Sequence, residues 1–307
     1  MGHLFRSLTL ADELSRRGGH VRFLVNDHAP SLEILARRGF AFEVVDPASN
    51  SAGREAETVR RLQASVWIND RLDTDAVHVA RVKSTGTPVV TFDDRGSGAA
   101  LSDLNVAALV FDPQEVDLLQ GARVLNGVDY LVLNPDIERF RRYRTHMRSV
   151  LVTLGGADTY GATVKVVRLL KGKSWQVTVV LGPAFVHHDE LAAVLPTHFD
   201  VKHGVLSMAE EMARHDIAVT GGGITPFEAN AAGLPCLVVA NELFEIPVAL
   251  ALERMGGCRY IGHHEAMKTS IFENSIDIRG MSERAMAAIG RQGVNKVASS
   301  VWELARL

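Results

Sequence analysis

Short apolar runs alternate with stretches of helical periodicity along this chain. In the first half, strand-like runs occur at 21–25, 40–45, 66–68 and 89–92, with further strand signals at 107–111 and 130–133. Helical patterns lie among them, at 4–14, 32–38, 57–63 and 75–84. Strands that alternate with helices are typical of α/β folds with parallel sheets.

The alternation starts again in the second half. Strands are predicted at 150–154, 176–181 and 199–202, and helices at 188–195, 208–215 and 247–255, before a helix-rich tail from 282 to 307. The charged stretch Glu138–Arg148 resembles a connection between domains. We therefore expect one domain over 1–140 and a second over 150–307, whose last helix is a candidate to pack back on the first.

The chain opens on a helical pattern rather than on a strand. In a doubly wound domain a helix that begins with Gly-His follows a strand, and no apolar run stands before Met1. The sequence thus leads us to expect an N-terminal domain whose first strand is missing.

The segment Asp216–Ala240 predicts a complete βαβ unit: an apolar strand, the turn Gly221–Gly223, a helix, and a second apolar strand. Glycines let a backbone approach a ligand closely, and a helix start offers N–H groups to an anion. Thr225 and Glu228 share one helix face by spacing. The alternative is a tight turn that needs glycine, with Glu228 as a solvated helix residue. The N–H donors of the turn, the Thr225 hydroxyl and the Glu228 carboxylate together would suit a phosphate and a sugar diol.

Composition narrows the class of protein. The 307 residues are 47% hydrophobic and 22% charged, as in ordinary globular proteins, and the net charge of −3 gives no electrostatic case for nucleic acid or an anionic membrane. Cys236 and Cys258 are too few for a disulfide framework, and a buried free thiol is expected for Cys236. With no apolar run of transmembrane length and no signal-peptide pattern, a cytoplasmic protein without a membrane span is expected.

Four ordered motifs carry a resemblance to a known family. They are Gly2-His3-Leu-Phe-Arg6, Thr91-Phe-Asp-Asp94, Leu154-Gly-Gly-Ala-Asp158 and the glycine unit followed by Ala240-Asn241-Glu242. The set is similar to the PseG/SpsG family of UDP-sugar hydrolases, within the MurG-like GT-B superfamily. The resemblance implies two Rossmann-like parallel-sheet domains facing a cleft. It also implies metal-independent hydrolysis of a UDP-linked amino-sugar, releasing UDP, in nonulosonic acid or surface polysaccharide biosynthesis.

The resemblance also implies roles for individual residues. His3 would be the general base that activates water, with Asn241 as a second catalytic contact, and Glu228 would bind the ribose hydroxyls. The substrate-binding residues that the resemblance implies are Gly2, Arg6, Asp70, Asp94, Gly155, Gly156, Val205, Leu206, Gly222, Gly223, Ile224, Thr225, Glu228 and Glu242. No cofactor, metal or nucleic acid is expected, the partner is a UDP-sugar, and the chain would be a monomer or weak homodimer.

Two departures from the family pattern bear on the substrate. Glu242 stands where the family has Gln, and Asn69-Asp70-Arg71 replaces a motif with a substrate-binding Tyr. A carboxylate at Glu242 would repel phosphate and favour a positive or hydroxyl-rich group on the sugar. The change at Asn69-Asp70-Arg71 is more similar to the SpsG side of the family and puts a pseudaminic acid precursor in doubt. A GT-B glycosyltransferase that uses a UDP-sugar donor stays open as an alternative, as does a non-catalytic nucleotide-sugar-binding relative.

Other polar groups have simpler interpretations. Asp93 and Asp94 could hold Mg²⁺, but directly after a strand they favour a capped turn. The adjacent pairs His187-His188 and His263-His264 are interpreted as surface histidines, because neighbouring side chains point apart.

Overall fold

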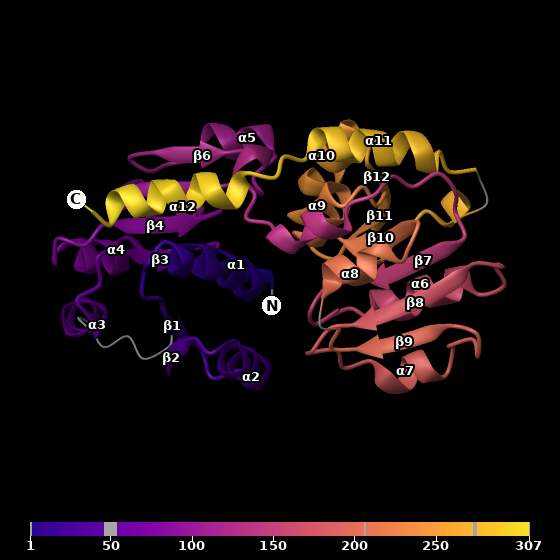
Figure 1. Cartoon of the computed structure of the whole chain (residues 1–307), viewed down its shortest axis with the longest axis horizontal. Coiled ribbons are helices and arrows are strands. Elements are labelled where there is room, and N and C mark those ends of the chain that lie inside the picture. The colour runs from indigo at the N-terminus through magenta and orange to yellow at the C-terminus, as the bar shows by residue number, and fades with distance from the viewer. Residues whose placement is uncertain (1, 46–53, 206, 273–274, 307) are drawn as a thin grey trace. The chain divides into compact units, whose positions relative to one another are not determined.

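The computed structural model describes residues 2–45, 54–205, 207–272 and 275–306. The chain forms two compact units (Figure 1): an N-terminal unit of residues 3–132 with 292–307, and a C-terminal unit of residues 133–291. Within the described ranges, none of the helices combines the length and the apolar character needed to cross a membrane.

The C-terminal unit is built on one six-stranded parallel sheet in the order β12-β11-β10-β7-β8-β9. Its strands are β7 (Ser149–Thr153), β8 (Gln176–Leu181), β9 (Asp200–His203), β10 (Ile217–Gly221), β11 (Cys236–Ala240) and β12 (Cys258–His263). This is the strand order of a Rossmann domain, in which all strands run parallel and the order in which they are added to the sheet reverses between β7 and β10. Ligands of such sheets bind beyond the carboxyl ends of the strands at this reversal, so the loops after β7 and β10 are the first place to look for a site.

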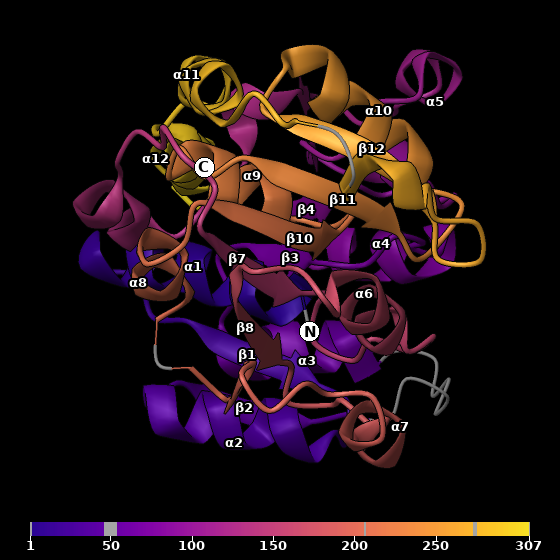
Figure 2. The same cartoon turned by 90° about the vertical axis from the view of Figure 1, so that its right-hand side faces the viewer.

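Helices cover both faces of this sheet, and α6 and α9 lie on opposite sides of it (Figure 2). The helices are α6 (Ala162–Leu170), α7 (His188–Ala192), α8 (Met208–Ala213), α9 (Thr225–Ala231), α10 (Glu245–Met255) and α11 (Ile278–Ala288), with short 3₁₀ turns η3 (Pro135–Phe140) and η4 (Thr269–Phe272). The strands β7, β10 and β11 are buried along their whole length, which explains their continuous apolar runs.

A buried arginine ties the helix ends of the C-terminal unit together. Arg144 is fully buried, and its guanidinium donates to the carbonyl oxygens of Arg142 (2.7 Å), Met212 (2.9 Å) and His215 (3.2 Å) and to that of Ala232. These acceptors include carbonyls at the ends of α8 and α9, where a helix runs out of its own N–H donors; they also accept from the His215 and Arg142 N–H groups, respectively. Arg144 thus supplies hydrogen bonds that no apolar side chain could.

The N-terminal unit holds two parallel sheets. The four-stranded sheet has the order β3-β4-β5-β6, and a separate pair joins β1 and β2. The strands are β1 (Arg22–Val25), β2 (Ala41–Val44), β3 (Trp67–Asn69), β4 (Val89–Phe92), β5 (Leu104–Ala107) and β6 (Val124–Asn126). Parallel βα alternation is thus present in both units, as the hydrophobic pattern predicts.

The helices of the N-terminal unit include one from the far end of the chain. They are α1 (Gly2–Arg16), α2 (Ala29–Arg38), α3 (Arg54–Leu62), α4 (Ala76–Lys83), α5 (Pro113–Asp117) and α12 (Gly293–Leu304), with 3₁₀ turns η1 (Ala99–Leu101) and η2 (Val128–Tyr130). Helix α12 lies beside β4 (Figure 1), where Val297 and Val301 share a core with Leu10, Val90 and Phe92.

Two of the predicted strands are wrong. The run 107–111 leaves the sheet after Ala107, because the Leu109 N–H donates to the Asp93 carboxylate (2.8 Å) instead of to a strand. The run 130–133 is also not a strand, since it is buried where the first residue of α12 packs closely on Leu131. Two strands of the structure were not predicted from the sequence. They are the three-residue β6 and the edge strand β12, whose apolar pattern is interrupted by Arg259 and His263.

Candidate active site

The first turn of α1 carries the most chemically distinctive group of the N-terminal unit. His3 Nδ1 lies 2.6 Å from Asp70 Oδ1, and Asp70 follows β3 directly. The His3 side chain is 46% exposed, whereas that of Asp70 is 11% exposed. The imidazole therefore has one nitrogen on a buried carboxylate and the rest of its ring toward solvent.

Arg6 stands behind this pair, one turn further along α1. It is buried, and its guanidinium forms ion pairs with both Asp70 and Asp93, with Nε 3.0 Å from Asp70 Oδ2. Burial opposes the charge, but the two carboxylates outweigh it and hold the pKa of Arg6 above its ordinary value. The guanidinium also lies over the Phe92 ring, 5.0 Å from its centroid. All three guanidinium nitrogens have protein partners, and two of them contact Asp70, so Arg6 holds that carboxylate in place.

Asp70 is likewise saturated by protein groups. It accepts hydrogen bonds from Arg6, from His3 and from the Ser7 hydroxyl (2.9 Å). Burial would raise the pKa of Asp70, but the His3 hydrogen bond and the charge of Arg6 lower it to about 2. A carboxylate held ionised in this way orients the imidazole: with Nδ1–H donated to Asp70, Nε2 keeps its lone pair and can accept a proton. In the described structure the Asp70 carboxylate thus contacts His3, Arg6 and Ser7.

The paired aspartates after β4 serve the backbone. Asp94 is 1% exposed, and its Oδ1 accepts from the N–H groups of Thr74 (2.9 Å) and Gly96 (2.9 Å). Its expected contact with substrate is therefore not accessible, because the loops that it joins cover it. Asp93, with φ of 49°, faces Arg6 and the Leu109 N–H. Gly2 begins α1, and a Cβ there would meet no atom within 4 Å.

In the C-terminal unit, the two glycine turns follow β7 and β10, the strands between which the strand order reverses. After β7, Gly155 has a left-handed φ of 96° and is exposed, while the Gly156 carbonyl accepts from the Ala184 N–H (2.9 Å). Asp158 accepts from the N–H groups of Ala162 and Thr163, both at 2.8 Å, and so caps α6.

The turn after β10 presents an unpartnered carboxylate near its helix. Ile224 precedes α9, Thr225 is its first residue, and Glu228 lies one turn on, all three half-buried. Within the described residues no hydrogen bond or ion pair reaches the Glu228 carboxylate, and burial raises its pKa to about 7. A half-buried carboxylate without a partner is suited to accept hydrogen bonds from a ligand diol.

The two later glycines of this turn differ from one another. A Cβ on Gly223 would meet no atom within 4 Å, and the residue is exposed. A Cβ on Gly222 would lie 2.6 Å from Glu245 Cβ, and the Gly222 N–H donates to Glu245 Oε2 (3.4 Å). Gly223 therefore has open space around it, while Gly222 packs against a protein side chain.

The loop after β11 contributes Asn241 and Glu242. The side-chain oxygen of Asn241 is buried and has no partner among the described residues. Glu242 accepts a hydrogen bond from the Tyr160 hydroxyl (2.8 Å), and Tyr160 stacks on His264 with centroids 4.2 Å apart. His264 is buried, so its interpretation as a surface histidine was wrong. Nothing in the local sequence around Tyr160 indicated this contact, because Glu242 lies 82 residues away.

The region expected near a base lies between β9 and α8. Val205 is half-buried there, and Ser207 caps α8 by accepting from the Glu210 N–H (3.2 Å). Leu206, also expected to bind substrate, lies outside the described residues.

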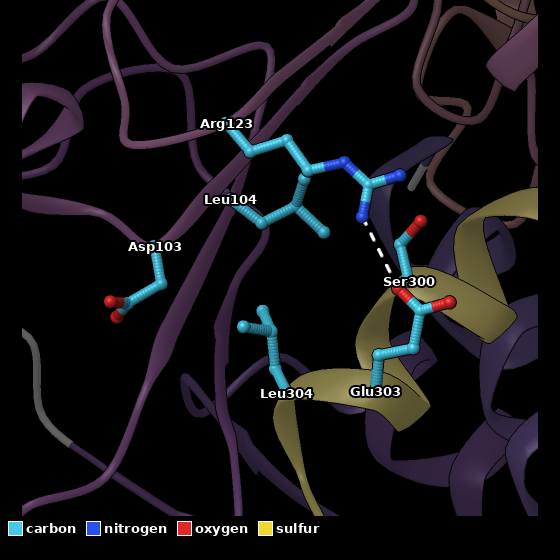
Figure 3. Close-up of a pocket in the computed structure, with 6 residues that line it drawn as sticks. All are labelled: Asp103, Leu104, Arg123, Ser300, Glu303 and Leu304. Carbon is cyan, nitrogen blue, oxygen red and sulfur yellow. Dashed lines mark hydrogen bonds and ion pairs between the residues drawn. The ribbon is translucent and has the colours of Figure 1, made fainter. Parts of the chain in front are cut away.

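A cavity of about 230 Å³ in the N-terminal unit is a separate feature (Figure 3). Its lining comes from β5, β6 and α12, and consists of Asp103, Leu104, Arg123, Ser300, Glu303 and Leu304. None of the candidate residues lines it, and it is smaller than the roughly 300–1,000 Å³ of ligand pockets. Over the ranges that the structure describes, no group of three or more His, Cys, Asp or Glu is arranged to hold a metal ion.

The comparisons with known proteins agree with this fold. No family model matches the chain. It is 25% identical over 268 residues to an uncharacterized protein of Methanocaldococcus jannaschii, covering 79% of this chain but only about half (54%) of that protein. It is 25% identical over 289 residues to the spore coat polysaccharide biosynthesis protein SpsG of Bacillus subtilis, covering 90% of this chain and 84% of SpsG. Acinetobacter baumannii MurG matches at a TM-score of 0.69 with 13% identity, over 98% of this chain and 96% of MurG. The chain thus has a GT-B fold of the MurG type.

Proposed function

We propose that this chain cleaves a UDP-sugar with water, releasing UDP and a free amino-sugar. The observation that carries the proposal is the His3–Asp70 pair, in which a buried carboxylate holds an exposed imidazole. An imidazole accepts protons near neutral pH, and a carboxylate on its other nitrogen fixes the ring and stabilises the imidazolium that forms. The geometry therefore suits a general base that acts on water.

In the proposed reaction, His3 Nε2 takes a proton from water as the water oxygen forms a bond to the anomeric carbon. The bond between that carbon and the diphosphate oxygen breaks, and its electron pair leaves with UDP. The imidazolium later returns its proton to solvent. Asp70 stays ionised throughout, because Arg6 and His3 hold its pKa at about 2.

The C-terminal unit supplies the nucleotide contacts in this proposal. Glu228 accepts from the ribose hydroxyls, and the open backbone at Gly223 and the Thr225 hydroxyl face the diphosphate. The unsatisfied oxygen of Asn241 would accept from the sugar or from the attacking water. The support is geometric: among the residues that the structure describes Glu228 has no partner, and these groups stand at the strand ends where this fold binds ligands.

The biological setting of the proposal rests on a relative. SpsG takes its name from spore coat polysaccharide biosynthesis, and the match covers most of both chains. We infer that the sugar released here is a precursor of a surface polysaccharide or of a nonulosonic acid.

Calorimetric titration with UDP, with GDP and CMP as controls, tests the nucleotide part. Selective UDP binding that is weakened by Glu228→Ala is the expected result. UDP release from UDP-amino-sugars without any acceptor then tests the hydrolytic part. If UDP binds selectively but no UDP-sugar is cleaved without an acceptor, the hydrolysis proposal fails, and a test with acceptors then separates a glycosyltransferase from a binding protein.

A glycosyltransferase is the second candidate, favoured by the structural match to MurG. There a sugar hydroxyl takes the place of water, and His3 deprotonates it. This candidate predicts little UDP release from the donor alone and a large stimulation by an acceptor sugar or lipid.

A further inference from the structure

Glu245 joins two loops at the carboxyl end of the C-terminal sheet. It is the first residue of α10, and its Oε2 accepts from the Asn241 N–H at 2.7 Å and more weakly from the Glu242 and Gly222 N–H groups, both at 3.4 Å. Asn241 and Glu242 belong to the loop after β11, whereas Gly222 belongs to the glycine turn after β10. One carboxylate oxygen therefore joins two loops. Gly222, in the farther loop, lies 23 residues before Glu245 in the chain.

The charge of Glu245 is held by backbone groups rather than by a cation. None of the ion pairs between described residues includes Glu245, and burial raises the pKa of its carboxyl. The three N–H groups and the start of an 11-residue helix stabilise the anion instead. One carboxylate oxygen thus accepts all three of these hydrogen bonds.

The glycine turn is shaped to receive this side chain. A Cβ on Gly222 would lie 2.6 Å from Glu245 Cβ, closer than two such atoms approach, whereas a Cβ on Gly223 would meet nothing within 4 Å. Neither residue has a left-handed φ, so the difference between them is one of space and not of backbone strain.

The loop that Glu245 fastens carries the Asn241 side chain. Asn241 Nδ2 lies 3.1 Å from the position of a Cβ on Gly221, so the amide stands directly over the end of β10. Its Oδ1 is buried without a partner among the described residues. The shortest Glu245 contact is to the backbone of this same residue, and it therefore limits where the amide can point.

We propose that Glu245 is a positioning residue, which fastens the loop after β11 to the glycine turn and so sets the Asn241 amide over Gly221 for the substrate. This inference rests on the proposed function for the role of Asn241, but the fastening itself can be tested without it. Glu245 acts through Asn241 and through backbone N–H groups, and has no contact with the reacting atoms in this account.

A double-mutant cycle tests the action through Asn241. In the presence of Asn241, Glu245→Gln is expected to lower kcat for UDP release by roughly tenfold or more with little change in KM. In the Asn241→Ala background the same change is expected to lower kcat less than about twofold, because the side chain to be positioned is gone. Glu253→Gln is the matched control, since Glu253 also lies on α10 and accepts a backbone N–H, that of Tyr260, at 3.1 Å. Equal losses of kcat in both backgrounds would overturn the proposal.

Amide hydrogen exchange tests the fastening independently of turnover. Glu245→Gln and Gly222→Ala should each speed exchange in two separate peptides, one covering the turn at 219–224 and one covering the loop at 239–244. Gly223→Ala should leave exchange of the 239–244 peptide unchanged. If Glu245→Gln alters only one peptide, the two loops are not joined through this carboxylate and the inference is wrong. If both peptides loosen but the wild-type protein cleaves no UDP-sugar, the fastening stands and the proposed function fails.

Discussion

His3 Nδ1 lies 2.6 Å from Asp70 Oδ1, with the imidazole exposed and the carboxylate almost covered. The orientation of the pair is fixed, because Arg6 and Ser7 also donate hydrogen bonds to the Asp70 carboxylate. Orientation of a base by a buried carboxylate gives each member a different role, and the two roles can be separated by substitution.

His3→Ala removes the proposed base. It should lower kcat for UDP release by roughly 10²–10⁴-fold, the usual contribution of general base catalysis, and leave UDP affinity nearly unchanged. Steady-state kinetics and calorimetric titration measure the two effects. His20→Ala, at an exposed residue of the same unit, is the control. Full activity of His3→Ala would show that another group activates the nucleophile.

Asp70→Asn keeps the shape of the carboxylate and removes its charge. The pKa of Asp70 is lowered to about 2 in the folded protein, so its ionisation contributes stability above the ordinary pKa of 3.8 and loses it as the pH falls toward 2. We expect the variant to be less stable by about 2 kcal/mol at pH 7, and the difference to shrink between pH 5 and 2. Urea unfolding across this range measures it, and a pH-independent difference would argue against an ionised Asp70 held by Arg6.

The effect of Glu228 on stability has the opposite pH dependence to that of Asp70. The pKa of Glu228 is raised from 4.5 to about 7, so the charged form costs stability as the pH rises from 4.5 through 7. The free energy of unfolding of Glu228→Gln should therefore exceed that of the wild type by up to about 3 kcal/mol at pH 8. Below pH 4.5 the two values should be equal.

The same variant should bind UDP more weakly, because a neutral amide is a poorer acceptor for two ribose hydroxyls. A gain in stability combined with a loss of affinity is the pattern of a carboxylate kept for a ligand. If Glu228→Gln leaves UDP affinity unchanged, Glu228 does not contact the ribose.

Arg144→Met tests the buried arginine of the C-terminal unit. The methionine fills part of the volume but removes the guanidinium hydrogen bonds to the carbonyls of Met212, His215 and Ala232. Each carbonyl keeps a second donor, which is the His215 N–H for Met212, the Arg142 guanidinium for His215 and the Arg142 N–H for Ala232. A lost hydrogen bond then costs about 0.5–1.5 kcal/mol, so a total loss of roughly 2 kcal/mol or more is expected in denaturant unfolding. Arg139→Met, at an exposed residue, should change stability by less than about 0.5 kcal/mol.

Local patterns predicted the elements better than they predicted the contacts. Continuous apolar runs placed β4 and β8 to the residue, because buried parallel strands have no polar face. The three-residue β6 was too short to stand out, and an apolar run that forms no strand, 107–111, was mistaken for one because burial and strand pairing leave the same signal.

The residues of the candidate site also fall into those that local patterns predict and those that depend on tertiary contacts. His3, Glu228 and Asn241 stand in recognisable motifs, so the sequence could nominate them. The roles of Asp70, Arg6 and Glu245 depend on which loops pack together, as in the contact between Arg6 and Asp93 across 87 residues. Spacing along a single chain holds no information about such contacts, so the burial of Arg6 and Asp94 could not be predicted from the sequence.

The most direct test of the proposed hydrolysis is incorporation of ¹⁸O from labelled water during cleavage of a UDP-amino-sugar without acceptor. Attack of water at the anomeric carbon predicts one ¹⁸O atom in the released sugar, none in UDP, and no labelled product with His3→Ala. Label in UDP, or cleavage that occurs only when an acceptor hydroxyl is supplied, would contradict the account.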